Sequence, residues 1–251
     1  MSTTQSPEQQ NQQQPLEENW MATPSVPNCP PGLEYLTQVD QLLVHQHFKK
    51  FTSFSRCHIE NRFDIKNASG QKIYIADEQI TCKGMWCGPS RSFEMQITDQ
   101  HEREILHLSR PFRCQCFPCC LQQLEVSASG SVCGFVKESW SLFVPKFRIC
   151  NAAGETVLRI EGPFCTFGCG RDIEFKIFTS NGNTQIGRIA KKWIGLTREV
   201  LSDIDHFGIS FPMDLDVNIK AVLLGACFLI DFMYFEGNGS RIGASLALCC
   251  L

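Results

Sequence analysis

"KAVLLGACFLIDFMYF", Lys220 to Phe235, is the most apolar stretch of the sequence. It contains helix-forming residues and no proline, and its apolar side chains would cover every face of a helix rather than one stripe. A helix that is apolar all round is buried, either in protein or in lipid. The architecture therefore depends on whether this segment crosses a membrane or forms the core of a folded domain.

Length and charge favour a core helix over a membrane span. As a helix, Ala221 to Phe235 would be about 22 Å long, whereas the hydrocarbon core of a bilayer is about 30 Å thick. Asp231 would cost roughly 2.5–3.5 kcal/mol near the bilayer centre. We therefore expect a helix enclosed by the domain, with Asp231 hydrogen-bonded near one end. If the segment instead spans a membrane, four basic residues precede it (Lys191, Lys192, Arg198 and Lys220), and one, Arg241, follows it. More positive charge on the N-terminal side predicts a single-pass type II protein with a cytoplasmic domain.

Five strand–turn–strand patterns precede this helix. They are "RFDIKNASGQKIYIA" (62–76), "SFEMQITDQHEREILHL" (92–108), "LQQLEVSASGSVCGFV" (121–136), "KFRICNAAGETVLRI" (146–160) and "DIEFKIFTSNGNTQIGRI" (172–189). Apolar and polar residues alternate in the first arms, as at Phe93, Met95 and Ile97, which is the period of a half-buried strand. Four turns contain Ser-Gly, Ala-Gly or Asn-Gly, which supply a positive φ, while the turn at 98–102 has no glycine. Hairpins repeated in this way predict an all-β closed barrel or sandwich.

The N-terminal segment differs in composition from the rest of the chain. Residues 1–31 are rich in Gln, Pro and Ser, so we expect a disordered tail, with the domain starting at Gly32. "PSVPNCPP", Pro24 to Pro31, contains two overlapping P-x-x-P patterns, which fit either a ligand for SH3-type modules or a stiff linker. The N-terminal residues lack the basic and apolar regions of a secretory signal, and we therefore expect a chain located in the cytosol or nucleus.

Several segments resemble the phospholipid scramblase family. They are "PPGLEYLTQVDQLLVHQ" (30–46), "RPFRCQCFPCCLQQLEV" (110–126), "VPKF" (144–147), "IGRIAKKWIGLTREV" (186–200) and "DHFGISFPMDLDVNIKAVLLGACFLIDFMYFE" (205–236). These segments occur in the family's order, and the resemblance extends over residues 30–237 without large gaps.

The resemblance implies both a fold and an activity. The fold would be Tubby-like: a closed antiparallel barrel of about twelve strands around the C-terminal hydrophobic helix. The barrel would comprise residues 32–237, the helix residues 219–235, and a tail residues 238–251. The activity would be calcium-dependent, ATP-independent, bidirectional movement of phospholipids between membrane leaflets by a palmitoylated protein of type II orientation.

The chain contains fifteen cysteines, although a reducing compartment does not favour disulfides. Four of them lie in "CQCFPCC" and are Cys114, Cys116, Cys119 and Cys120. Their close spacing makes a single tetrahedral zinc site awkward, unless Cys165 and Cys169 complete one. The resemblance implies that the four are palmitoylated, and two or more acyl chains give stable membrane attachment. Inert thiols are the other alternative. Cys249 and Cys250 form no C-a-a-X box, and they are either further acylation sites or residues of no known role.

The acidic segment "DIDHFGISFPMD", residues 203–214, can be aligned with the twelve positions of an EF-hand loop. The candidate calcium ligands are Asp203, Asp205, Asp214 and the carbonyl of Ile209. Phe207 and Phe211 occupy positions where an EF-hand has further oxygen ligands, so we expect binding in the micromolar-to-millimolar range. The resemblance also implies a calcium site here, which makes Ca²⁺ the expected cofactor. The alternative is an acidic connection between strands, with both phenylalanines in the core.

A basic stretch around Trp193 contains Arg188, Lys191, Lys192 and Arg198. In the family, the matching segment resembles a non-classical nuclear-import sequence, which implies an importin-type receptor as a partner. The same side chains could instead face anionic lipid headgroups, at about 1 kcal/mol per residue near the surface. The third alternative is an ordinary solvated face. The net charge of −3 gives no direct evidence for nucleic-acid binding.

Two functional hypotheses follow from these patterns. The sequence contains no nucleophile elbow, phosphate-binding loop or dinucleotide fingerprint, and moving lipid between leaflets requires no covalent chemistry. The first hypothesis is a scramblase that is not an enzyme and is attached to the cytoplasmic face of a membrane, with the plasma membrane favoured. The second is a palmitoylated adaptor or nuclear regulator that binds protein partners, located in the nucleus when not acylated. Homo-oligomers are a further expected assembly.

Overall fold

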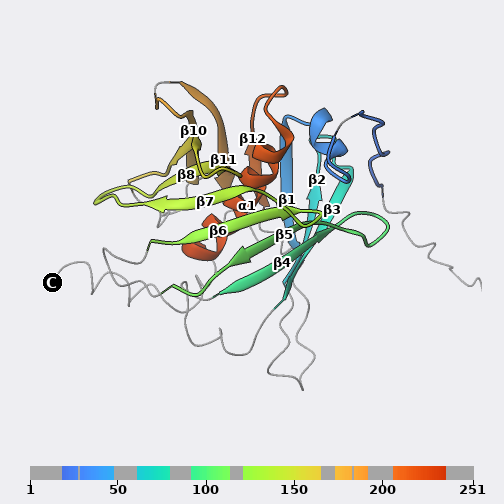
Figure 1. The fold of residues 1–251 in the computed structure, drawn as a ribbon, viewed down its shortest axis with the longest axis horizontal. Helices are drawn as coiled ribbons and strands as arrows, with labels where there is room; N and C mark the ends of the chain where they lie inside the picture. Colours follow the sequence, from blue (N-terminus) through green and yellow to red (C-terminus); the bar gives the residue numbers. More distant parts are fainter. Residues whose placement is uncertain are drawn as a thin grey trace, which may run out of the picture.

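The computed structural model describes residues 19–27, 29–47, 61–79, 92–113, 121–164, 173–182, 184–191 and 206–235. Within these residues, twelve antiparallel strands form a closed barrel around one α-helix (Figure 1). The predicted fold, a mainly β barrel enclosing a C-terminal hydrophobic helix, is confirmed. A sandwich is excluded because the first and last strands pair with each other.

The strands follow one another around the barrel in sequence order, and β12 then pairs with β1. Their bounds are β1 Gln41–His47, β2 Arg62–Lys66, β3 Lys72–Gln79, β4 Phe93–Thr98, β5 Glu104–Arg110, β6 Gln123–Ala128, β7 Ser131–Ser139, β8 Lys146–Asn151, β9 Thr156–Glu161, β10 Ile173–Thr179, β11 Gln185–Lys191 and β12 His206–Ser210. A short 3-10 helix, η1, covers Glu34–Gln38, and α1 covers Val217–Tyr234. Because the barrel is closed, no sheet edge is left unpaired within the described strands.

All five predicted hairpins are present, as β2–β3, β4–β5, β6–β7, β8–β9 and β10–β11. The turn without glycine forms through Asp99. Its carboxylate accepts hydrogen bonds from the backbone N–H groups of His101 and Arg103, at 2.8 and 3.0 Å, and from the Arg103 side chain. Glu102 takes the positive φ of +59° that a glycine would otherwise supply. The hydrogen bonds to Asp99 therefore stabilise a turn in which a non-glycine residue, Glu102, takes the positive φ.

The two ends of the barrel differ. At one end, called the turn end, lie η1 and the short turns of the five hairpins. The other end, called the loop end, is where the odd-numbered strands finish: β1, β3, β5, β7, β9 and β11. For example, Ser139 at the end of β7 pairs with Lys146 at the start of β8, which pairs with Glu161 at the end of β9. α1 runs through the barrel from η1 at the turn end to the end of β11 at the loop end (Figure 1).

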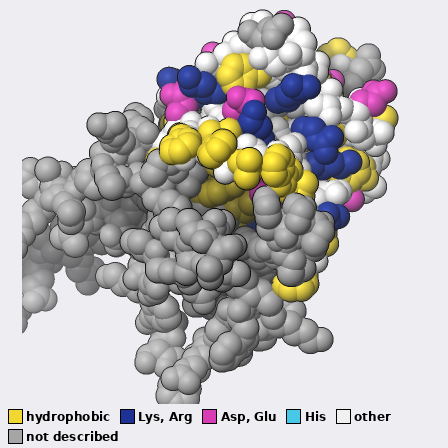
Figure 2. All heavy atoms as spheres, turned by 90° about the vertical axis from the view of Figure 1, so that its left-hand side faces the viewer, with side chains coloured by type: hydrophobic (Ala, Val, Ile, Leu, Met, Phe, Trp, Pro, Cys, Tyr) yellow, Lys and Arg dark blue, Asp and Glu magenta, His cyan; other side chains and the backbone are white. Residues whose placement is uncertain are grey.

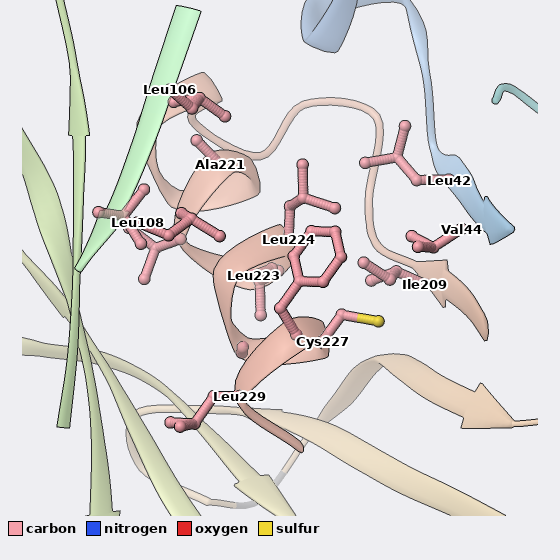
Figure 3. Packing of buried hydrophobic residues seen from close by; sticks show 14 of the residues in the cluster. Leu42, Val44, Leu106, Leu108, Ile209, Ala221, Leu223, Leu224, Cys227 and Leu229 are labelled. Atoms are coloured by element: carbon pink, nitrogen blue, oxygen red, sulfur yellow. The ribbon is translucent and has the colours of Figure 1, made fainter. Parts of the chain in front are cut away.

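α1 forms the centre of the core. Leu224 and Cys227 point toward Val44 and Ile209 of β1 and β12 (Figure 3). On the opposite side the helix approaches the sheet closely at Gly225, where an added Cβ would lie 2.7 Å from the Cγ2 atom of Val126. α1 is capped by the preceding residue, Asp216, whose side chain accepts hydrogen bonds from the N–H groups of the first helical turn.

Among the described residues, α1 is the one helix whose length and composition would allow it to cross a membrane. The core helix of a soluble protein passes the same test, and 78% of its residues are buried inside the barrel. The expectation of an enclosed helix is therefore met, with bounds within two residues of the predicted 219–235.

Residues before Gly32, the expected start of the domain, also pack against the barrel. Trp20 forms a parallel bridge with Lys72, and the N–H of Met21 donates to the carbonyl of Lys72 at 2.8 Å. Pro24 is half-buried, and Thr23 shares a hydrogen bond with the hydroxyl of Tyr35. Residues 19–21 thus pair with the first residue of β3, and Thr23 contacts η1. One of the two predicted P-x-x-P patterns, 24–27, follows directly in the same described segment.

Candidate functional site

A buried lysine holds the N-terminal end of α1. The side chain of Lys220 has no exposed surface, and its ammonium donates to the carbonyls of Leu36, Val39 and Met213 at 2.8, 3.0 and 2.7 Å. An ammonium group has three protons, and all three have an acceptor here. The same nitrogen lies 5.2 Å from the ring centre of Phe211. Lys220 therefore ties α1 to η1 and to the chain that follows β12.

The charge of Lys220 is balanced by acidic groups near the turn end. Desolvation lowers the pKa of Lys220, while the carboxylates of Asp40 and Asp214 oppose this shift. Asp214 is one of the predicted calcium ligands, and the structure places it next to Met213, whose carbonyl binds Lys220. Its carboxylate is thus part of the electrostatic environment of a buried cation.

The rest of the predicted calcium loop is placed only in part. Asp203 and Asp205 lie outside the described residues. Residues 206–210 form β12, and Ile209 pairs with Leu42 and Ile189 in the two neighbouring strands, with its side chain fully buried. The backbone of Ile209 therefore belongs to the sheet in this conformation. Phe207 and Phe211 lie in the core, as the alternative interpretation of this segment expected.

An ion pair holds the C-terminal end of α1. The Nζ atom of Lys191, the last residue of β11, lies 3.7 Å from the Oδ1 atom of Asp231, and both side chains are mostly buried. The ammonium also lies 4.8 Å from the ring centres of Phe207 and Phe235, which are suitable distances for cation–π contacts. Asp231 therefore lies near the mouth of the barrel, as expected, and its charged partner there is Lys191, at an ion-pair distance that is too long for a hydrogen bond.

The predicted basic stretch is divided between two environments. Arg188 is exposed on the outer face of β11, with its guanidinium 4.0 Å from Glu174. Lys191 instead turns into the mouth of the barrel, so the expectation that it faces solvent or lipid does not describe this conformation. The physical reason is Asp231, because a carboxylate in an apolar helix requires a nearby cation. Lys192 and Arg198 lie outside the described residues.

The predicted acylation sites Cys114, Cys116, Cys119 and Cys120 lie outside the described residues, as do Cys165, Cys169, Cys249 and Cys250. Cys29, Cys133, Cys150 and Cys227 are described, and they are free thiols. Burial raises the pKa of Cys133 to about 11 and raises the pKa of Cys227 as well. These thiols therefore act as small hydrophobic core groups. The part of the chain that the structure describes holds no group of three or more potential metal ligands.

Comparison with known proteins decides the family. A model of the Scramblase family matches residues 21–237. This chain belongs to the Scramblase family. The match begins at Met21, whose N–H donates to the carbonyl of Lys72 in β3.

Named relatives align with most of this scramblase-family chain. It is 49% identical to phospholipid scramblase 2 of Bos taurus over 88% of this chain and 78% of the relative. It is 46% identical to phospholipid scramblase 1 of Homo sapiens, over 88% and 71% of the two chains. It is 43% identical to phospholipid scramblase family member 5 of Homo sapiens, over 88% and 82%. No solved structure matches the chain significantly.

The contacts at the two ends of the scramblase-family helix were missed in detail by the sequence interpretation. The sequence predicts Lys191 as part of a basic stretch that faces solvent, lipid or a receptor, and it predicts no contact for Lys220. One signal for these contacts was present in the sequence. Lys220 and Asp231 are the charged residues of an otherwise apolar helix, and they lie about three turns apart. Buried charges require partners, but the identity of those partners depends on how the barrel closes.

Proposed function

We propose that this chain moves phospholipids in both directions between membrane leaflets, in a calcium-dependent and ATP-independent reaction. The observation that carries the proposal is the similarity, over 88% of the chain, to relatives named phospholipid scramblase. Such movement makes and breaks no covalent bond, so it requires no catalytic nucleophile, acid or base. It does require a polar route for the headgroup through the hydrocarbon layer.

The enclosed helix limits where this route can lie. α1 fills the barrel, and a barrel without it would have an empty apolar interior. One molecule therefore cannot use α1 both as its core and as a membrane span. In the conformation described, the headgroup route lies outside the barrel, along disturbed bilayer or between oligomeric copies. A type II orientation would require the barrel to open and α1 to insert into the bilayer.

Calcium is the proposed cofactor and would bind to residues 203–214. An ion bound by Asp203, Asp205, Asp214 and the Ile209 carbonyl requires β12 to leave its partners, since β12 lies between the acidic residues along the chain. Its release would expose Phe207 and Phe211. Calorimetric titration is expected to give binding in the micromolar-to-millimolar range, weakened in Asp214→Asn and unchanged in the control Asp77→Asn. Absence of heat up to about millimolar calcium would remove this part of the proposal.

Membrane attachment is proposed to depend on S-palmitoylation of the cluster Cys114, Cys116, Cys119 and Cys120. The residues that flank the cluster lie at the loop end, where the Arg113 guanidinium donates to the carbonyl of Leu121 at 3.1 Å. Acyl-exchange labelling of the variant with all four cysteines changed to Ala is expected to fall, together with its membrane fraction. Unchanged labelling and partition would rule out these sites.

An adaptor or nuclear regulator is the second candidate, favoured by the enclosure of α1. A closed barrel with a filled interior offers the described surface for binding partners and no transmembrane route. The proposed partners are SH3-type modules at Pro24–Pro31, an importin-type receptor at the basic stretch, and further copies of the chain. The proposed locations are the cytoplasmic face of the plasma membrane and, without acylation, the nucleus.

Reconstitution separates the two candidates. The purified full chain is inserted into vesicles that contain a fluorescent lipid reducible only from outside. Calcium-stimulated loss of the inner-leaflet fluorescence without ATP is expected for a scramblase. Retention of that fluorescence, with insertion verified by flotation, would contradict lipid movement and favour the adaptor. Vesicles with heat-denatured protein provide the control for leakage.

A further inference from the structure

Large hydrophobic side chains are exposed at the loop end of the barrel. This apolar rim consists of Phe112, Trp140, Leu142, Phe143 and Phe164, which are between 51% and 76% exposed. They come from the connections that follow β5, β7 and β9, so three separate segments contribute to one end of the molecule. The rings of Phe143 and Phe164 stack, with centres 6.2 Å apart. A clustered apolar surface of this kind indicates an interaction site.

A second unusual feature lies beside the rim, on the outer face of the barrel. Lys137, Arg148 and Arg159 stand directly opposite one another on β7, β8 and β9. Like charges in direct cross-strand register destabilise a sheet. Arg148 and Arg159 are exposed, and no ion pair of any of the three is found among the described residues. We call these three residues the basic row.

The rim and the basic row lie close together. Lys137 is three residues before Trp140, which corresponds to about 10 Å along a strand. Figure 2 shows a face on which hydrophobic side chains gather beside Lys and Arg side chains. A surface-bound protein typically inserts apolar groups about 5–10 Å into the boundary between headgroups and acyl chains. Basic side chains about 10 Å behind that tip would lie level with the lipid phosphates.

We propose that the apolar rim and the basic row form a docking surface for a bilayer that contains anionic phospholipids. The rim inserts below the headgroups, and the basic row contacts their negative charges, which relieves the repulsion between the three cations. The proposal rests on the membrane function given above and adds the surface and the lipid class. The acylation cluster is flanked by Arg113 and Leu121 of the same end, so acyl chains there would enter the same bilayer.

The test is vesicle binding by the full chain, produced without acylation. Vesicles contain phosphatidylcholine alone or mixed with phosphatidylserine. Arg148→Gln/Arg159→Gln is expected to bind the anionic vesicles about 30-fold more weakly, since each basic residue near the surface contributes about fivefold. Leu142→Ser/Phe143→Ser/Phe164→Ser is expected to lose about tenfold or more on both kinds of vesicle. High salt should weaken wild-type binding and have little effect on the basic-row variant.

The matched control is Arg62→Gln/Lys66→Gln on β2, which removes the same charge on the opposite side of the barrel. Its binding is expected to equal that of the wild type. Because all the altered side chains lie on the outer surface, thermal melts should show no loss of stability, and the basic-row variant should melt at a slightly higher temperature because it has less repulsion between like charges. As an independent readout, brominated lipids should quench tryptophan fluorescence in the wild type and much less in Trp140→Phe.

Two outcomes would overturn the proposal. One is vesicle binding that neither the rim variant nor the basic-row variant alters. The other is binding of duplex DNA or a protein partner through these residues without binding to anionic vesicles. Failure of the lipid-movement assay is a separate result: a chain that docks as described but leaves the inner-leaflet fluorescence intact contradicts the scramblase function and supports the docking surface.

Discussion

The Nζ atom of Lys191 lies 3.7 Å from the Oδ1 atom of Asp231, which joins the last residue of β11 to the last turns of α1. At the opposite end of the helix, Lys220 donates to three backbone carbonyls. The apolar length of α1 provides the core, and these two cations determine its position along the barrel. An apolar helix alone could slide along a barrel of similar side chains, and buried polar contacts can oppose such a shift.

Lys191→Met is expected to lower the free energy of unfolding by about 3 kcal/mol, because it leaves the carboxylate of Asp231 mostly buried without this cation. Urea denaturation followed by circular dichroism measures the change. The double variant Lys191→Met/Asp231→Leu should recover much of the loss, since replacing a whole buried pair is often neutral. Arg188→Gln, on the exposed face of the same strand, is the control and should change stability by less than about 0.5 kcal/mol.

Lys220→Met is expected to cost about 2–4 kcal/mol, because the carbonyls of Leu36, Val39 and Met213 lose their buried donor. Hydrogen exchange should also increase in η1, which Lys220 ties to the helix. The control is Lys176→Met on the exposed face of β10. Equal stability of the two variants would show that Lys220 does not anchor the helix.

Gly225→Ala is expected to destabilise the barrel by about 1–3 kcal/mol, the usual range for an overpacked core. The new Cβ would lie 2.7 Å from Val126 and 3.1 Å from Leu124. Combining it with Val126→Ala should reduce the loss if the steric contact is the cause. Gly208→Ala is the matched control, because the nearest atom to its added Cβ is 3.8 Å away. A melting temperature that is the same for Gly225→Ala as for the wild type would contradict the close approach.

Asp64 predicts a pH dependence of stability. Burial alone would raise its pKa, but hydrogen bonds from His47 and the charge of Lys72 hold the pKa below its ordinary value. The stabilisation is therefore complete above the ordinary pKa of about 3.9 and is lost as the pH falls through the lower, folded-state pKa. Asp64→Asn should cost roughly 2 kcal/mol at neutral pH and almost nothing in strong acid. A pH-independent difference, or an equal effect of Asp77→Asn, the control at a less buried carboxylate, would contradict this assignment.

The hairpins were predictable because their signals are local. Alternation at Phe93, Met95 and Ile97 and glycine at the turns predict each pair of strands without reference to the rest of the chain. The turn around Asp99 could also be predicted as a turn, but its mechanism required the structure. β1 and β12 lie outside the hairpins, and their pairing is the step that closes the barrel. The repeated hairpins predicted either a closed barrel or a sandwich, and only the family resemblance implied a barrel around the helix, because pairing between distant segments leaves no local pattern.

The sequence could predict that the buried charges of the candidate site need partners, but it could not predict which residues those partners are. A carboxylate in an apolar helix requires a partner, which was foreseen for Asp231, but nothing local identifies Lys191 as that partner. The basic row is similar: the lysine and arginines are visible in the sequence, yet their alignment depends on the register of β7, β8 and β9. Such register comes from the closed sheet as a whole.

The central claim is that α1 stays inside the barrel, so membrane attachment depends on acyl chains and surface contacts. The most direct test is alkaline carbonate extraction after neutral hydroxylamine has cleaved all thioesters on isolated membranes. The account predicts that the deacylated chain is released into the supernatant, while chain treated with Tris buffer in place of hydroxylamine remains in the pellet. Full retention of the deacylated chain with the bilayer, as for a protein anchored by a spanning helix, would contradict it.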